Sequence, residues 1–176
     1  MFRAKKKKEE PRALPPVNAA KLIAQQSIRA AVIAAAIVAI CLNFVWLWLS
    51  EISGSFFHWY SVLQAPLIGL AVRHAGRGID WRFPAIAAAV TMLAAFSGNF
   101  LVSVVTTSAV LEASPLQVLR GLTLWSWQTW FDEVLNFADL VYALFGAAVA
   151  AFYARRRLRR NEVFALRSMN NQESVR

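Results

Sequence analysis

Residues 30–42 read AAVIAAAIVAICL and contain no charged side chain. They lie in a longer apolar stretch, residues 28–49, which has Arg29 at one end and Trp46 and Trp48 at the other. A buried helix of a soluble bundle repeats a polar face about every 3.6 residues, whereas this stretch has no charged face. Because roughly 20 apolar residues cross the hydrocarbon core of a bilayer, the stretch predicts a membrane-spanning helix.

Three further stretches have a similar character. They are residues 55–72, which Pro66 interrupts, residues 83–105, which are rich in alanine, and residues 131–154, which end at Arg155. We therefore expect an all-α integral membrane protein with four transmembrane helices. The expected membrane domain covers residues 28–154, between a basic and largely disordered cytoplasmic arm at residues 1–27 and a basic cytoplasmic tail at residues 155–176.

The composition agrees with a membrane protein, because 58% of the residues are hydrophobic and 16% are charged, yet the net charge is +9. Of the 19 lysines and arginines, eight precede or open the first stretch, three lie between the second and third, and seven follow the fourth. With four spans, 18 of the 19 lie on one side of the membrane. The positive-inside rule makes that side cytoplasmic. We expect a protein of a bacterial inner membrane with both termini in the cytoplasm.

The composition also excludes several kinds of site. Cys41 is the only cysteine and there are two histidines, so neither a disulfide scaffold nor a four-ligand zinc site is expected. The chain contains no H-E-x-x-H motif and no serine, histidine and aspartate set with supporting glycines. We expect no enzymatic activity, no metal and no cofactor. The lysine run at residues 5–8 lacks interleaved aromatic residues, so nucleic acid is not an expected partner.

The segment between the third and fourth stretches, about 25 residues long, carries a helix start. Ser114 and Pro115 are typical of an N-cap followed by proline in the first turn. Leucines at positions 116, 119 and 122 recur at helical spacing, and tryptophans follow at positions 125, 127 and 130. We expect one short helix in the outer interface, which acts either as a lid or partner surface or as an anchor held by its tryptophans.

Among the polar side chains within the expected spans, five form a candidate intramembrane cluster: Asn43, His58, Gln64, Asn99 and Asp139. At about 1.5 Å of rise per residue all five lie in the outer half of the membrane, with Asp139 about eight residues, roughly 12 Å, into the fourth span. Two explanations remain open. The side chains either hydrogen-bond across helices and hold the bundle together, or line a polar cavity open to the outside and bind a ligand. A pair of His58 with Asp139 would respond to protons.

Small residues recur on the expected spans. They are Gly69 in the second, Gly98 beside Ala94 and Ala95 in the third, and Gly146, Ala147 and Ala150 in the fourth. Small side chains let helix backbones approach closely in a membrane. These positions therefore predict packing seams between the helices.

The loop between the second and third spans is basic and glycine-rich, with Arg73, Gly76, Arg77, Gly78 and Arg82. Gly76 and Gly78 permit positive φ angles, which indicates a tight cytoplasmic turn. The arginines fix the orientation, and together with exposed backbone N–H groups they are candidates to hold a lipid phosphate. A plain basic turn and a lipid-phosphate loop remain alternatives. Anionic lipid at the cytoplasmic face is an expected partner in both cases.

This loop carries a resemblance to a known family. Residues 75–80 read AGRGID, Phe83 follows, the next helix contains Gly98 and Asn99, and Asp139 stands three residues before Tyr142. The pattern, over roughly residues 55–154, resembles a family of small bacterial multi-pass membrane proteins of unknown function with a basic AGKGID-like cytoplasmic loop. The resemblance implies a multi-pass helical bundle and no established activity. Some members carry an N-terminal zinc ribbon, whose cysteines this chain lacks, so no zinc function is implied.

Two functions follow from the sequence. The first is a non-enzymatic accessory or scaffold subunit that acts through helix and lipid contacts, with a membrane protein as its partner. The alternative is binding or transport of a small molecule or ion by the outer polar residues around Asp139.

Overall fold

The structure, a computed structural model, describes residues 18–122, 128 and 136–173, with side chains as far as Met169. Within these ranges every helix or strand is an α-helix. The chain divides into two compact units, a larger one at Gln26–Arg156 and a smaller one formed by the segments on either side of it. The larger unit carries all of the candidate site residues.

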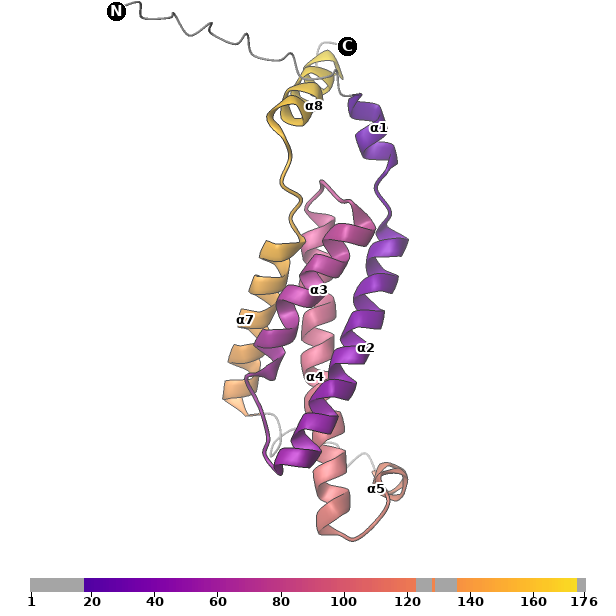
Figure 1. Cartoon of the computed structure of the whole chain (residues 1–176), viewed down its shortest axis with the longest axis vertical. Helices are drawn as coiled ribbons and strands as arrows, with labels where there is room; N and C mark the ends of the chain where they lie inside the picture. Colours follow the sequence, from indigo (N-terminus) through magenta and orange to yellow (C-terminus); the bar gives the residue numbers. More distant parts are fainter. Residues whose placement is uncertain (1–17, 123–127, 129–135, 174–176) are drawn as a thin grey trace, which may run out of the picture. The chain divides into compact units, whose positions relative to one another are not determined.

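Four long helices form the larger unit. They are α2 (Ile28–Ser53), α3 (Tyr60–Gly76), α4 (Arg82–Val110) and α7 (Phe137–Ala154), with the short helix α5 (Pro115–Gly121) after α4. Helices α3 and α4 each pack against the other three long helices, whereas α2 and α7 do not contact each other (Figure 1). Of the described helices, α2, α4 and α7 are long and apolar enough to cross a membrane. Helix α3, in the place of the second expected span, has 17 residues.

The helix bounds differ from the expected ones mainly at the end of α2, the start of α3 and the start of α7. Helix α2 begins at Ile28 as expected but continues to Ser53, where Gly54 ends it in the left-handed conformation with φ 61°. Residues 55–59 were expected to be helical and instead form the turn before α3. Pro66 lies inside α3 without ending it. Helix α7 begins at Phe137, and residues 131–135, which the fourth expected span includes, lie outside the described residues.

Small residues bring α3 and α7 into close contact. A Cβ atom at Gly69 would lie 2.5 Å from the carbonyl oxygen of Ala150, and one at Gly146 would lie 2.9 Å from the carbonyl oxygen of Ser61. Both distances are too short for a side chain, so each glycine lets the backbone of the facing helix approach. The seam predicted from Gly69, Gly146 and Ala150 is therefore confirmed. Close packing of this kind drives helix association where the surrounding solvent is apolar.

The glycine-rich loop turns in a different way from the one expected. Gly76 and Gly78 do not have positive φ angles, and the left-handed residue is Arg77, with φ 47°. The glycines are needed for space instead, because a Cβ at Gly78 would overlap the ring of Phe83 and one at Gly76 would lie 2.7 Å from it. Phe83 is 1% exposed beneath the loop. The expectation of positive φ at the glycines is therefore wrong. Glycine is needed at both positions because the Phe83 ring leaves no room for a side chain.

Helix α5 begins as the sequence predicted. Ser114 is the N-cap of α5, its hydroxyl accepts the Gln117 backbone N–H, and the Gln117 side chain accepts the Ser114 backbone N–H. Pro115 occupies the first turn. The tryptophans expected to anchor this helix, at positions 125, 127 and 130, lie outside the described residues.

The smaller unit contains two helices that the sequence did not predict. Helix α1 (Ala19–Ala24) lies in the arm that was expected to be largely disordered, and α8 (Arg160–Glu173) lies in the basic tail. Asn18 caps α1, because its side-chain oxygen accepts the backbone N–H groups of Ala20 and Lys21. Helices α1 and α8 contact each other, and Leu22 of α1 is buried.

The α3–α7 seam yields a stability prediction. Gly69→Ala should lower the free energy of unfolding by about 1–3 kcal/mol, because the added methyl group meets the α7 backbone, which cannot rotate away. The measurement is unfolding of the purified protein in mixed micelles by titration with a denaturing detergent. Gly121→Ala is the control, because its Cβ meets nothing within 4 Å among the described residues. Equal stability of Gly69→Ala and the wild type would contradict the seam.

Candidate functional site

Of the five expected polar residues, the structure joins His58 to Asp139 in a direct contact at the start of α3 and α7. Asn43, Gln64 and Asn99 are buried on α2, α3 and α4, and among the described residues none of them hydrogen-bonds to this pair. The site therefore has two parts, which are described in turn.

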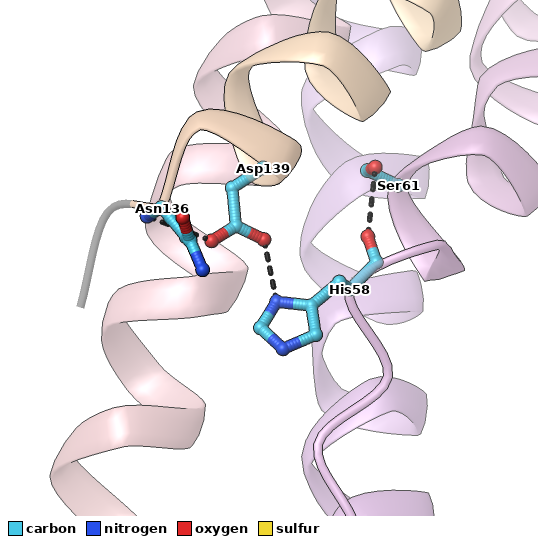
Figure 2. Close-up of polar contacts among 4 residues, drawn as sticks. All are labelled: His58, Ser61, Asn136 and Asp139. Carbon is cyan, nitrogen blue, oxygen red and sulfur yellow. Dashed lines mark hydrogen bonds and ion pairs between the residues drawn. The ribbon is translucent and has the colours of Figure 1, made fainter.

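The first part is a short polar contact between His58 and Asp139. The Nδ1 atom of His58 lies 2.6 Å from the Oδ1 atom of Asp139. The side chain of Asp139 is 0% exposed, whereas that of His58 is 43% exposed. Figure 2 shows the second ring nitrogen of His58 pointing away from the carboxylate. The imidazole thus covers a buried carboxylate with one edge, and among the described residues its second ring nitrogen has no hydrogen-bond partner.

Asp139 is held by the start of its own helix. It is the third residue of α7, and its Oδ2 atom accepts the backbone N–H of Asn136 at 3.2 Å. The N-terminus of a helix carries unpaired N–H groups and a partial positive charge, both of which favour a carboxylate. Each oxygen of Asp139 therefore has a polar partner (Figure 2). These contacts tie the first turn of α7 to the start of α3.

The depth expected for Asp139 is corrected by the helix start. The sequence placed it about eight residues into the fourth span, whereas it stands two residues after Phe137, about 3 Å along the helix axis. The reason is that Asn136 is extended and acts as the N-cap, inside what the sequence shows as one apolar run. The spacing of Asn136 and Asp139 is that of a capping pair, and this signal could have located the helix start.

His58 is positioned by the turn that precedes α3. The hydroxyl of Ser61 donates to the carbonyl oxygen of His58 at 3.3 Å, which fixes the turn to the first residues of the helix (Figure 2). The ring of Phe56 lies against the imidazole, with ring centroids 4.5 Å apart. The backbone turn and the aromatic contact together aim the imidazole at α7.

The second part, here called the amide cluster, consists of Asn43, Trp46, Gln64 and Asn99. The exposed fractions of these residues are 7%, 0%, 1% and 2%. Asn43 donates from Nδ2 to the hydroxyl of Ser97 at 3.0 Å. Five polar atoms of the cluster have no hydrogen-bond partner among the described residues: Asn43 Oδ1, Trp46 Nε1, Gln64 Nε2, Gln64 Oε1 and Asn99 Oδ1.

Sequence reasoning missed two members of this region. Trp46 stands at the end of the first apolar stretch and is fully buried against Tyr60, with ring centroids 5.1 Å apart. Ser97 was not among the candidate residues, and it accepts a hydrogen bond from Asn43. Trp46 follows Asn43 by three residues on the same face of the helix, and that spacing is the signal that could have indicated its burial.

The basic loop is attached firmly to the start of α2. The Gly76 carbonyl oxygen accepts the Ser27 backbone N–H at 3.0 Å, and the Gln26 side chain accepts the Ile79 backbone N–H at 3.2 Å. Of the candidate lipid-phosphate residues, Arg77 and Arg82 are exposed, Arg73 is partly buried, and Gly76 and Gly78 are buried beneath them. The loop thus presents arginine side chains outward from a fixed backbone.

A pocket of about 440 Å³ lies between the C-terminal ends of α2 and α4. Leu47, Glu51, Phe56, Thr106 and Pro115 are among its lining residues, and neither His58, Asp139 nor any member of the amide cluster is. The pocket is therefore separate from both parts of the site. A search of the described residues finds no group of three or more histidine, cysteine, aspartate or glutamate side chains that could hold a metal ion.

The His58–Asp139 contact can be measured by a double-mutant cycle with His58→Gln, Asp139→Asn and the double variant. We expect a coupling free energy of about 1–3 kcal/mol, because a charge-assisted hydrogen bond to a buried carboxylate is lost in either single variant. The free energy of unfolding in mixed micelles is the readout. Asp80→Asn, which changes an exposed carboxylate, is the control. A coupling free energy of zero would show that the contact does not contribute to the free energy of unfolding.

The chain matches no known protein family, and no characterised protein or solved structure is detectably similar to it. The resemblance of the AGRGID loop to a family of bacterial membrane proteins therefore stays a prediction. What the chain can do must be argued from its own helices and polar contacts.

Proposed function

We propose that the chain is a four-helix integral protein of a bacterial inner membrane, in which α2, α3, α4 and α7 are the spans and α5 lies in the outer interface. Three of these helices have the length and apolar character of a span. The resemblance of residues 75–80 to the AGKGID-like loop implies the same kind of protein.

Helix α3 is the remaining one of the four spans in this proposal, and it is the second in chain order. Its 17 residues extend about 26 Å at 1.5 Å per residue, at the lower limit for crossing the hydrocarbon core. It also contacts the three other long helices, and Ser61 and Gln64 on it are buried in the bundle. A helix surrounded by other helices meets little lipid, so it tolerates polar side chains that an outer span would not.

Both termini lie in the cytoplasm in this arrangement. Four spans place residues 1–27, the loop with Arg77 and Arg82, and residues 155–176 on one side, where 18 of the 19 basic residues gather. The exposed arginines of the loop then face the headgroups of the cytoplasmic leaflet. Anionic lipid is the partner that this charge favours, at about 1 kcal/mol for each basic residue near the surface.

Within the membrane the protein acts as an accessory or scaffold subunit and not as an enzyme. The observation that carries this proposal is that Asp139 spends both carboxylate oxygens on structural contacts, with His58 and with the Asn136 backbone. The outward face of α2 offers a continuous apolar ridge, in which Ile33, Ile37 and Phe44 are more than half exposed. Lipid and the helices of a membrane-protein partner are the surfaces that such a ridge can contact.

A second candidate function is binding or transport of a small molecule or ion near Asp139. The observation that favours it is the second ring nitrogen of His58, which has no hydrogen-bond partner among the described residues and belongs to a side chain that is 43% exposed beside a buried carboxylate.

The two candidates are separated by gentle purification in native lipid, followed by native mass spectrometry of the wild type and of Asp139→Asn. An accessory subunit should carry a protein partner at fixed stoichiometry, and Asp139→Asn should retain it because the partner contacts the apolar faces. A small ligand lost from Asp139→Asn but retained in the control Asp80→Asn, with no protein partner in either, would overturn the scaffold proposal in favour of the second.

A further inference from the structure

The amide cluster contains polar atoms for which the described part of the chain supplies no partner. Buried amide and indole groups are nearly always hydrogen-bonded, because burying one without a partner costs about 1–3 kcal/mol in a protein. The cluster holds five such atoms on four residues of three helices. Five such atoms on three helices that pack against one another are more than an isolated packing defect would give, and their donors and acceptors require a partner.

Contacts between α2 and α3 place Asn43 and Gln64 at the same height along the bundle. The ring of Tyr60 stacks on Trp46, and the Tyr60 hydroxyl donates to the carbonyl oxygen of Leu42 at 3.2 Å. Leu42 precedes Asn43 in α2. Gln64 lies one turn after Tyr60 on the same face of α3, so its amide is directed to the same side of the bundle as the Tyr60 hydroxyl.

Helix α4 approaches the same place through a glycine. A Cβ atom at Gly98 would lie 2.5 Å from the ring of Trp46 and 2.9 Å from the Oδ1 atom of Asn43. The next residue is Asn99, which is 2% exposed. The open oxygen of Asn43, the ring of Trp46 and the backbone of α4 therefore meet at Gly98.

The orientation of the Asn43 amide follows from its partner. The hydroxyl of Ser97 donates its proton to the carbonyl oxygen of Leu93 at 2.7 Å. Toward Asn43 the same hydroxyl can therefore act only as an acceptor. Asn43 must then present its N–H to Ser97, at 3.0 Å, and leave its carbonyl oxygen free. At Gln64 both amide atoms are open, so exchanging them changes nothing.

The open atoms define the chemistry of the occupant. Trp46 Nε1 and Gln64 Nε2 are donors, whereas the side-chain oxygens of Asn43, Gln64 and Asn99 are acceptors. None of these groups is charged, so neither a cation, which the donors would repel, nor an anion, which the oxygens would repel, fits the set. The occupant must be neutral and must both donate and accept hydrogen bonds.

We propose that the amide cluster is a buried hydration site, in which water molecules bridge Asn43, Trp46, Gln64 and Asn99 between α2, α3 and α4. Water is the smallest molecule with the required chemistry, and a bound water typically makes about three hydrogen bonds to buried polar groups. The site is independent of Asp139, whose two oxygens already have partners. It therefore stands whether the protein is a scaffold or binds a ligand near His58.

Radiolytic hydroxyl-radical footprinting of the wild-type protein in lipid nanodiscs tests the site directly, because radicals formed from bound water oxidise the side chains beside it. Trp46 should be oxidised although it is fully buried. Phe83, which is 1% exposed in the apolar core near the loop, is the matched control. After correction for the intrinsic reactivity of each side chain, Trp46 should react at least several-fold faster than Phe83. Equal corrected rates would overturn the proposal.

A substitution gives a second test, because the expected change in melting temperature differs between a hydrated and a dry cluster. Gln64→Met removes two polar atoms at nearly constant volume. If water bridges the cluster, the substitution takes hydrogen bonds from that water and should lower the melting temperature. If the cluster is dry and its amide atoms stay unpaired, losing two of them should leave the melting temperature unchanged or raise it, and the proposal fails. Leu63→Met, at an exposed neighbouring position, is the control.

Discussion

The contact between α3 and α7 runs from a polar end to an apolar one, and the rest of the bundle is arranged around it. At its start the buried carboxylate of Asp139 meets His58, and further along Gly146 and Gly69 let the two backbones touch. The polar pair fixes which ends of the helices meet, while the glycines fix how closely they approach. Because α3 also packs on α2 and α4, its position against α7 also determines where those two helices pack (Figure 1).

Much of the fold follows from the sequence, because apolar runs, helix caps and small residues are local signals. They located α2 and α4, the serine cap of α5 and the glycines of the α3–α7 seam. The start of α7 and the turn before α3 were misplaced, since the extended N-cap Asn136 lies inside the expected fourth span and residues 55–59 look no less apolar than a helix. Hydrophobicity alone does not distinguish a helix from the extended chain that leads into it.

The candidate site was predictable as a set of residues but not as an arrangement. Polarity within the spans identified all five side chains. Which of them meet depends on helix rotation and tilt, which packing decides and the sequence pattern does not reveal. The structure assigns His58 and Asp139 to a contact between helix ends, and it buries the three amides and Trp46 on α2, α3 and α4. One polar part therefore serves the joining of helices, and the other, in our proposal, holds water.

The central claim is that α3 crosses the membrane as the inner helix of a four-span bundle. Cysteine labelling in a Cys41→Ser background tests it, with single cysteines at the exposed positions Ser55 and Asp80 on either side of α3. In intact cells a membrane-impermeant maleimide should label Ser55→Cys, whereas Asp80→Cys should react only after the membrane is permeabilised. Labelling of both positions, or of neither, in intact cells would place both ends of α3 on one side and contradict the account.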